Sequence, residues 1–398
     1  METLINRHKR LISQVKTNLV RSYIDKIDWD TKLIAIRGAR GVGKTTLLLQ
    51  YIKLNYGSDT KRCLYVSLDS LYFSQHTLSE CVEKFYQNGG EHLFLDEVHK
   101  YPSWSVEIKN IYDEYPDLKI VFTGSSLINI LNTEADLSRR CIAYDMQGLS
   151  YREFLSLYKK IDLPSYSLNE ILENADDICN KVNEKTRPLQ YFDEYLRYGY
   201  YPFYLEKTQD YYTRIENITN MILDIELPQL CGVDVGNIRK IKALLQVMAS
   251  GFPMMVDITR LGTLSGLSRT TILSYLQYLD RAKLISLLYS DETSVKKMQK
   301  PDKILMENAN LLYAISSETV NIGTARETYF CNQLRNSHTV EYASKGDFRI
   351  DGKYTFEIGG KSKDGKQIAN IENAYIAAAD TEYANGNKLP IWLFGMMY

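Results

Sequence analysis

The chain has 398 residues, which is too long for a single hydrophobic core, so we expect roughly two to four domains. Its formal net charge of −1 excludes a strong overall attraction to nucleic acid or to anionic membranes. The six cysteines lack metal-ligand spacing, which favours free thiols in a reducing compartment. No stretch is apolar enough to span a membrane, and the amphipathic N-terminus does not resemble a signal peptide. We therefore expect a cytoplasmic protein with no membrane partner.

The first part of the chain predicts a doubly wound α/β domain. Residues 1–30 predict an amphipathic helix followed by a short connection. Apolar runs separated by helix-length segments then predict a parallel sheet. Its candidate strands are 33–37, 63–68, 92–96, 119–124 and 141–145.

A phosphate-binding pattern follows the first candidate strand. Gly38, four further residues, and then Gly43, Lys44 and Thr45 form the Walker A motif G-x-x-x-x-G-K-[ST] between a strand and a helix. Backbone N–H groups of such a loop face phosphate oxygens, the lysine reaches the β- and γ-phosphates, and the threonine hydroxyl binds Mg²⁺. The predicted nucleotide-binding residues are Gly38, Ala39, Arg40, Gly41, Val42, Gly43, Lys44, Thr45, Thr46 and Asp96.

Two adjacent carboxylates close the third candidate strand. Asp96 and Glu97 stand at its C-terminal end, where ligands bind in open α/β sheets. With a Walker A motif about fifty residues upstream, they predict a Walker B motif. Asp96 would then complete the Mg²⁺ site with Thr45, and Glu97 would polarise the attacking water.

Two further groups are candidates for contact with the γ-phosphate. Ser125, in the segment T-G-S-S after the fourth strand, is the first candidate for a sensor, and Thr123 is the second. The alternative is that this serine only caps the next helix. Arg139 or Arg140 could act as an arginine finger, either in cis or across a subunit interface. The alternative for these two residues is a pair of surface cations.

The segments G-A-R-G-V-G-K-T-T, L-F-L-D-E-V, F-T-G-S-S, S-R-R and Q-G-L-S-Y-R-E-F-L together are similar to one family. They resemble prokaryotic AAA-type ATP-binding proteins, related to the archaeal-ATPase group, that carry a C-terminal domain of uncharacterised function. The segment 197–205 resembles the Gly-Gly-x-Pro stretch of that family's helical lid, although Tyr200 departs from it. The resemblance implies ATP binding and hydrolysis, a P-loop ATPase core over 1–189 and a helical lid over 190–236.

Residues 237–304 predict a winged helix-turn-helix of three short helices and a hairpin. Its third helix would expose Arg269, Thr270, Thr271, Ser274 and Gln277. Between residues 237 and 288 there are seven Lys or Arg against two Asp, and the wing adds Lys296, Lys297 and Lys300. This local excess of positive charge predicts binding to double-stranded DNA. The alternative is a module for protein contacts or for packing between domains.

The region 305–398 predicts a small α/β domain similar to the restriction-endonuclease fold. The expected elements are a helix at 324–336, strands at 339–343, 347–350 and 353–358, a helix at 367–379 and a strand at 389–395.

Nucleases of this fold hold a metal ion with an Asp, then a Glu, and a Lys two residues after the Glu. Asp347 and Glu357 match that pattern, and Glu327 could supply an extra helix carboxylate. Gly359 stands at the lysine position, and the nearest lysine is Lys361. Since this lysine orients the attacking water, the pattern favours a degenerate domain.

The fold class predicted is therefore α/β: a P-loop NTPase with an AAA-type parallel sheet, a helical lid, a winged helix and a small nuclease-like domain. The predicted function is a molecular switch that binds and hydrolyses ATP with Mg²⁺. It would couple its nucleotide state to DNA or to a protein partner, and a finger acting in trans would require a nucleotide-dependent homo-oligomer. The alternatives are an ATP-gated DNA nuclease and a nucleotide-binding scaffold with little turnover.

Overall fold

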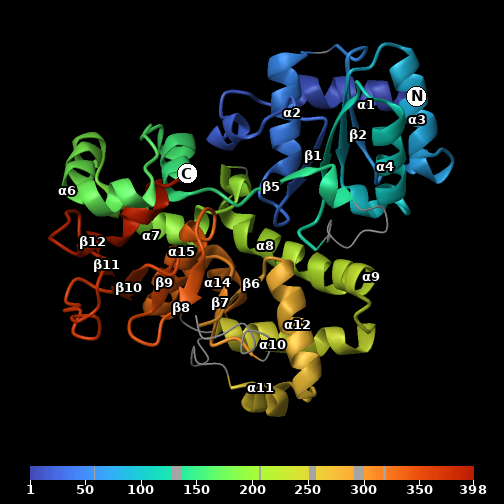
Figure 1. The fold of residues 1–398 in the computed structure, drawn as a ribbon. Coiled ribbons are helices and arrows are strands. Elements are labelled where there is room, and N and C mark those ends of the chain that lie inside the picture. The colour runs from blue at the N-terminus through green and yellow to red at the C-terminus, as the bar shows by residue number, and fades with distance from the viewer. Residues whose placement is uncertain (58, 128–136, 206–207, 251–256, 291–299, 317–319) are drawn as a thin grey trace. The chain divides into compact units, whose positions relative to one another are not determined.

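The computed structural model describes residues 1–57, 59–127, 137–205, 208–250, 257–290, 300–316 and 320–398 (Figure 1). The chain forms two compact units, Met1–Gln147 and Gly148–Tyr398. The expected ATPase core of 1–189 therefore differs from the structure, in which the first unit closes at Gln147. Residues 148–189 belong to the second unit because Tyr151 and Phe154 pack in the same core as Tyr195 and Tyr329.

The first unit is built on a five-stranded parallel sheet with the order β2-β3-β4-β1-β5. Its strands are β1 (Leu33–Arg37), β2 (Cys63–Ser67), β3 (His92–Asp96), β4 (Lys119–Thr123) and β5 (Ile142–Asp145). All five predicted strands are confirmed, with ends that agree to within one residue. The sequence reveals them because strands buried on both faces are continuous apolar runs: every residue of β2 and β3 is buried.

Helices cover this sheet (Figure 1). They are α1 (Glu2–Gln14), α2 (Lys44–Asn55), α3 (Leu78–Gln87) and α4 (Trp104–Glu114), with short 3-10 turns η1 (Ser22–Lys26), η2 (Leu71–Ser74), η3 (Val98–Lys100) and η5 (Leu137–Arg139). The N-terminal helix is shorter than expected, because Val15 already has an extended backbone (ψ 133°). Leu4 of α1, Phe85 of α3 and Ile108 of α4 share one core with the sheet.

The second unit combines helices with two sheets. Its α-helices are α5 (Tyr151–Phe154), α6 (Leu168–Lys185), α7 (Pro188–Tyr198), α8 (Tyr211–Met221), α9 (Leu227–Cys231), α10 (Ile238–Ala249), α11 (Ile258–Ser265), α12 (Arg269–Arg281), α14 (Ala309–Ile315) and α15 (Ile322–Leu334). Shorter helical turns are η6 (Leu155–Lys159), η7 (Pro202–Leu205), η8 (Thr208–Asp210), η9 (Ile222–Glu226), η10 (Val235–Asn237) and η11 (Ile391–Met396).

The middle of the second unit contains the elements expected for 237–304. Helices α10, α11 and α12 are followed by the antiparallel hairpin of β6 (Ile285–Leu288) and β7 (Lys303–Met306). The tip of the expected wing, with Lys296 and Lys297, lies outside the described residues. These elements are compatible with a winged helix, which therefore stays a prediction.

The C-terminal sheet has the order β12-β11-β10-β9-β8. Its strands are β8 (Val340–Tyr342), β9 (Phe348–Ile350), β10 (Tyr354–Gly359), β11 (Ala374–Ala378) and β12 (Lys388–Pro390). Strands β8 to β10 are antiparallel, and β10 to β12 are parallel. Helix α15 packs on this sheet through Phe330, which contacts Phe348, Phe356 and Phe394.

Two expected elements of this region are wrong. The predicted helix at 367–379 contains β11, because pairing with β10 and β12 on both sides outweighs the helical propensity of its alanines. The predicted strand at 389–395 ends at Pro390 and continues as η11, whose six residues are all buried.

Two global properties bear on function. No helix in the described part of the chain is long and apolar enough to cross a membrane. All six cysteines are free, and burial raises the pKa of the Cys81 and Cys179 thiols to about 11.

Two buried histidines make the first unit sensitive to pH. The Nδ1 atom of His8 in α1 accepts the N–H of Tyr65 on the edge strand β2 (2.9 Å), and His92 lies 3.0 Å from the hydroxyl of Tyr56. Burial lowers the pKa of His8 to about 4 and that of His92 to about 3, from 6.5. The folded state therefore keeps both rings neutral while the unfolded chain takes up protons.

We expect the free energy of unfolding to fall as the pH drops from about 6.5 towards 4, by up to about 1.4 kcal/mol per pH unit for each histidine. Urea denaturation at several pH values would measure this slope. The slope should be smaller in His8→Gln, whose amide oxygen can still accept the Tyr65 N–H. The comparison variant is His76→Gln, which replaces a histidine whose side chain is 42% exposed. Equal slopes in wild type and His8→Gln would contradict the assignment.

Candidate functional site

The loop from Gly38 to Gly43 joins β1 to α2 at the C-terminal edge of the parallel sheet. Gly38 has φ +152°, and a Cβ atom there would lie 2.1 Å from the carbonyl oxygen of Met146. Gly43, the N-cap of α2, has φ +98° in the left-handed region. Only glycine fits both positions without strain, so the loop can bring its backbone close to a ligand.

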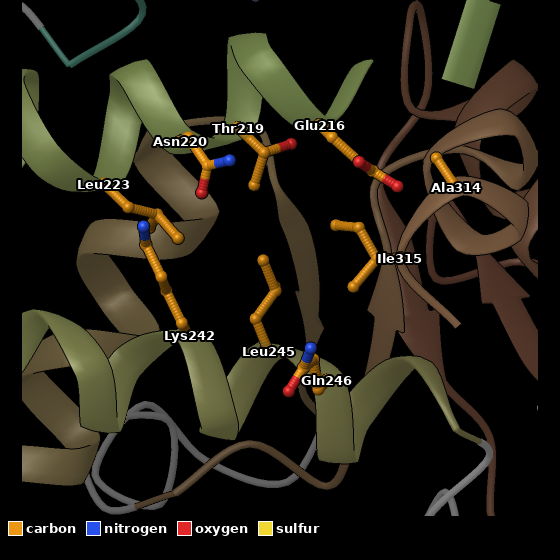
Figure 2. A pocket seen from close by; sticks show the side chains of 9 residues that line it. All are labelled: Glu216, Thr219, Asn220, Leu223, Lys242, Leu245, Gln246, Ala314 and Ile315. Carbon is orange, nitrogen blue, oxygen red and sulfur yellow. The ribbon is translucent and has the colours of Figure 1, made fainter. Parts of the chain in front are cut away.

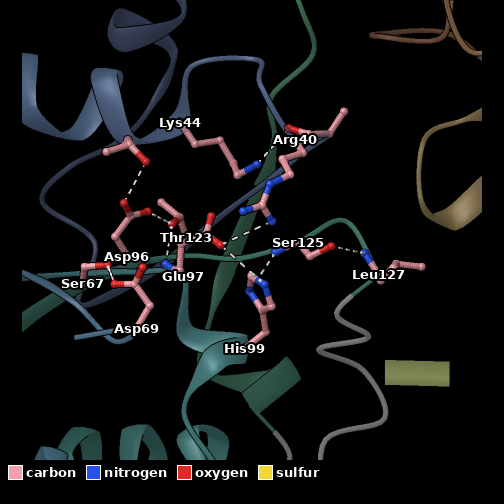
Figure 3. A network of polar contacts seen from close by, with 12 residues as sticks. Arg40, Lys44, Ser67, Asp69, Asp96, Glu97, His99, Thr123, Ser125 and Leu127 are labelled. Carbon is pink, nitrogen blue, oxygen red and sulfur yellow. Dashed lines mark hydrogen bonds and ion pairs between the residues drawn. The ribbon is translucent and has the colours of Figure 1, made fainter. Parts of the chain in front are cut away.

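Lys44 begins α2 and folds back over this loop. Its Nζ donates to the carbonyl oxygens of Gly38 (2.8 Å) and Ala39 (2.9 Å), and the residue is only 8% exposed. Val42 of the loop is buried, and Thr46 is exposed in the first turn of α2. The ammonium group thus lies within the loop where the motif predicts phosphate (Figure 3).

The carboxylate of Asp96, at the end of β3, accepts hydrogen bonds from three hydroxyl groups. Its Oδ2 accepts from Thr45 (2.7 Å) and from Tyr65 (2.7 Å), and its Oδ1 accepts from Thr123. The donors come from α2, β2 and β4, and the strand order places β2 and β4 on either side of β3. The pKa of the Tyr65 hydroxyl is raised, first by burial and then by the neighbouring Asp96.

Thr45 and Asp96 suit the Mg²⁺ ion that a Walker motif implies. A hydroxyl and a carboxylate are hard oxygen donors of the kind that Mg²⁺ prefers, and here they already touch at the mouth of the loop. The sequence predicts this pair correctly as neighbours. It does not predict Tyr65, whose only signal is its place on the strand beside β3.

Glu97 follows Asp96 with a left-handed backbone (φ 56°). Its Oε2 lies 3.8 Å from Arg40 Nη1 of the phosphate loop and 3.5 Å from His99 Nε2 (Figure 3). Its N–H donates to Thr123 Oγ1 (3.2 Å). The predicted water-polarising carboxylate is therefore oriented by two cationic or polar side chains, of which His99 was not expected.

Ser125 is connected to Glu97 through His99. The N–H of Ser125 donates to His99 Nδ1 (3.4 Å), so a neutral ring carries its proton on Nε2, on the side of Glu97. The Ser125 hydroxyl accepts the N–H of Leu127 (3.3 Å), which is the turn-capping contact of the alternative interpretation. Thr123, the second sensor candidate, touches both Asp96 and Glu97. The sensor role of Ser125 stays a prediction.

The two candidate finger arginines have different surroundings. Arg140 Nε lies 3.1 Å from Asp113 Oδ1 of α4, and its guanidinium stands 5.9 Å from the centre of the Tyr112 ring. Arg139 is exposed at the end of η5. Arg140 therefore contacts α4 within its own unit, and Arg139 is the more exposed of the two.

The second unit brings together the three carboxylates predicted for a nuclease-like site. Glu327 lies on α15, Asp347 directly precedes β9, and Glu357 lies on the central strand β10. Lys303 Nζ is 2.7 Å from Glu327 Oε2 and 3.8 Å from Asp347 Oδ1. Lys361, the lysine nearest to the expected position in the sequence, is exposed after the strand ends at Gly359, and Lys363 pairs with Glu357 (2.9 Å).

A pocket of about 300 Å³ lies between α8, α10 and α14 (Figure 2). Leu223, Leu245 and Ile315 form its apolar part, while Glu216 and Lys242 stand at opposite ends in this view. No predicted site residue lines it. Lys242 is one of the seven basic residues between 237 and 288, and it pairs with Asp224 (2.8 Å).

Comparisons with known proteins agree with this geometry for the first unit. Residues 30–155 match the family model of an AAA domain, and residues 189–321 match that of a domain of unknown function, DUF8612. The chain is 28% identical over 318 residues to the uncharacterized protein MJ1637 of Methanocaldococcus jannaschii, covering 76% of this chain. It spans 66% of the length of that relative.

Solved structures with partial similarity include the Aeropyrum pernix ORC1 protein in complex with DNA (TM-score 0.32, 10% identity, 82% of this chain and 91% of that chain). Thermotoga maritima RuvB has a TM-score of 0.28 at 15% identity, with 75% of this chain and 95% of that chain covered. AMPPCP-bound DnaA from Aquifex aeolicus has a TM-score of 0.27 at 15% identity, with 70% of this chain and 87% of that chain covered. These scores are too low to equate whole folds. Residues 30–155 thus match an AAA domain, and the loop within them has the glycine geometry expected of a P-loop.

Proposed function

We propose that this protein is an ATP-binding and ATP-hydrolysing molecular switch. The observation that carries the proposal is the meeting of Thr45, Asp96 and Glu97 beside the glycine loop. These residues come from two separate motifs, and the sheet brings them to one edge. A structural turn would not need a buried lysine, a shared carboxylate and a second carboxylate at the same place.

In this mechanism the loop amides and Lys44 bind the β- and γ-phosphates of ATP. Thr45 and Asp96 would hold Mg²⁺, which neutralises the charge on the phosphates when bound. Glu97 polarises a water for in-line attack on the γ-phosphorus, and Arg40 and His99 orient its carboxylate. Ser125 would contact the γ-phosphate. Its backbone N–H bonds to His99, so the presence or absence of that phosphate would affect how His99 orients Glu97.

Replacing Glu97 by Gln should keep nucleotide binding but remove most turnover, because the amide keeps the size of the side chain and loses the charge that polarises water. Lys44→Ala should weaken both binding and turnover. ATP turnover by phosphate release, and binding of a fluorescent ATP analogue, would measure the two effects. Glu91→Gln is the matched control, since Glu91 precedes the same strand and is exposed.

Full turnover in Glu97→Gln would remove Glu97 from the mechanism. Binding without turnover in the wild type would instead favour the alternative of a nucleotide-binding scaffold that recruits protein partners. Measuring turnover with and without double-stranded DNA would show whether a client is needed.

We also propose that subunits share the site in a nucleotide-dependent homo-oligomer, with Arg139 as the finger. Its side chain is more exposed than that of Arg140, which supports this choice. Arg139→Ala should lower turnover by on the order of 10³-fold. Mixing Arg139→Ala with Glu97→Gln should restore part of it, since some interfaces then combine an intact finger with an intact glutamate.

The comparison variant is Arg140→Ala, for which we expect a smaller loss of turnover and a lower thermal stability, because Asp113 loses an ion-pair partner. No recovery on mixing, together with a monomeric mass in the presence of ATP, would argue for a role in cis.

The output of the switch is proposed to be binding of duplex DNA through α10–α12 and the hairpin. Helix α12 is capped by Ser268 and presents Arg269, Thr270 and Gln277 to solvent. Arg260 on α11 is also exposed. The alternative of a protein-binding module keeps the same exposed face but needs no basic residues on it.

DNA affinity should fall steeply with salt, because each neutralised phosphate contributes about −0.9 to the log–log slope. The double change Arg260→Ala/Arg269→Ala should weaken binding and flatten the slope. Fluorescence anisotropy with a labelled duplex between about 50 and 200 mM salt would measure both. Lys181→Ala on α6 is the control for loss of an exposed charge elsewhere. Binding that is independent of salt, or absent at low salt, would contradict the proposal.

A further inference from the structure

The nuclease-like cluster of the second unit already contains its own cations. A metal site of the nuclease type needs Asp347 and Glu357 with an open place for the ion. Here Lys303 and Lys363 lie against the three carboxylates instead. Among the described residues, no group of three or more His, Cys, Asp or Glu side chains is arranged to hold a metal ion.

Lys303 is the more deeply buried of the two cations. It belongs to β7 of the hairpin, its side chain is 3% exposed, and its Nζ lies 4.6 Å from the centre of the Phe348 ring. Its partner Glu327 is also buried, which raises the pKa of that carboxyl, while the nearby ammonium acts in the opposite direction. A buried ammonium is retained only where charges of opposite sign compensate for lost hydration.

Lys363 reaches the cluster by an unexpected route. Its aliphatic stem passes directly over Gly359, where an added Cβ would lie 2.8–2.9 Å from the Lys363 Cβ, Cγ and Cδ atoms. The glycine that replaces the expected lysine is thus the reason that a later lysine can reach Glu357. Asp347 stays beside both pairs because its Oδ2 accepts the N–H of Ile358 (2.6 Å).

We propose that the Lys303 ammonium is the resident cation of this cluster and takes the electrostatic place of a divalent metal ion. Three carboxylates are then balanced by two lysines within ion-pair distance. The same ammonium fastens β7 to α15 and to the start of β9, so it joins the hairpin to the C-terminal sheet. The domain would therefore not cut DNA.

The test measures Mn²⁺ binding by the full chain without nucleotide. Binding is detected as a loss of the EPR signal of free Mn²⁺. Wild type and Asp347→Asn should bind the same amount, because the cluster holds no ion. Lys303→Met removes the charge at similar length and should gain about one additional ion per chain. That gain should disappear in Lys303→Met/Asp347→Asn, and Lys303→Arg should behave as wild type. Lys345→Met is the control for loss of an exposed lysine near Asp347.

Wild-type Mn²⁺ binding that is lost in Asp347→Asn would overturn the proposal, as would a folded Lys303→Met chain that gains no ion. If Lys303→Met does not fold, Lys303→Met/Glu327→Gln removes both charges of the pair and should show the gain. We also expect no nicking of supercoiled plasmid with Mg²⁺ or Mn²⁺, with or without ATP. Cleavage that disappears in both Asp347→Ala and Glu357→Ala would show that the alternative of a gated nuclease is correct.

Discussion

The buried carboxylate of Asp96 is the interaction on which the nucleotide site depends. It is 3% exposed, so its oxygen atoms need hydroxyl donors in place of the water that burial removes. Thr45, Tyr65 and Thr123 supply those donors from three elements. Because each donor can reach Asp96 only if its own strand or helix is correctly positioned along the sheet, this one side chain ties the register of the sheet to the position of the phosphate loop.

The strands and both Walker motifs could be predicted from sequence because their signals are local. Continuous apolar runs mark the buried strands, and the loop residues follow one another in the chain. The partners that orient the motifs could not be predicted. Tyr65 and His99 meet Asp96 and Glu97 only through the order of the strands and a turn after β3, and neither has a distinguishing sequence pattern.

The errors in the second unit have the same origin in long-range contacts. The alanines of β11 favour a helix locally, yet their backbone groups form hydrogen bonds with two neighbouring strands. The position of Lys363 depends on the length and path of a flexible side chain. The boundary at Gln147 depends on buried tyrosines: the hydroxyls of Tyr151 and Tyr195 donate to backbone carbonyls while their rings fill the core.

The close fit of Gly38 against Met146 has a mechanical consequence, because Met146 lies next to the last residue of the first unit. Arg21 reinforces this fit: its Nη1 donates both to the Val42 carbonyl in the phosphate loop (3.2 Å) and to the Gln147 carbonyl (2.7 Å). A loop that shifts to admit phosphates would therefore pull on the peptide that leads into the second unit. Nucleotide binding would in this way be felt at Met146 and Gln147 through contacts made entirely inside the first unit.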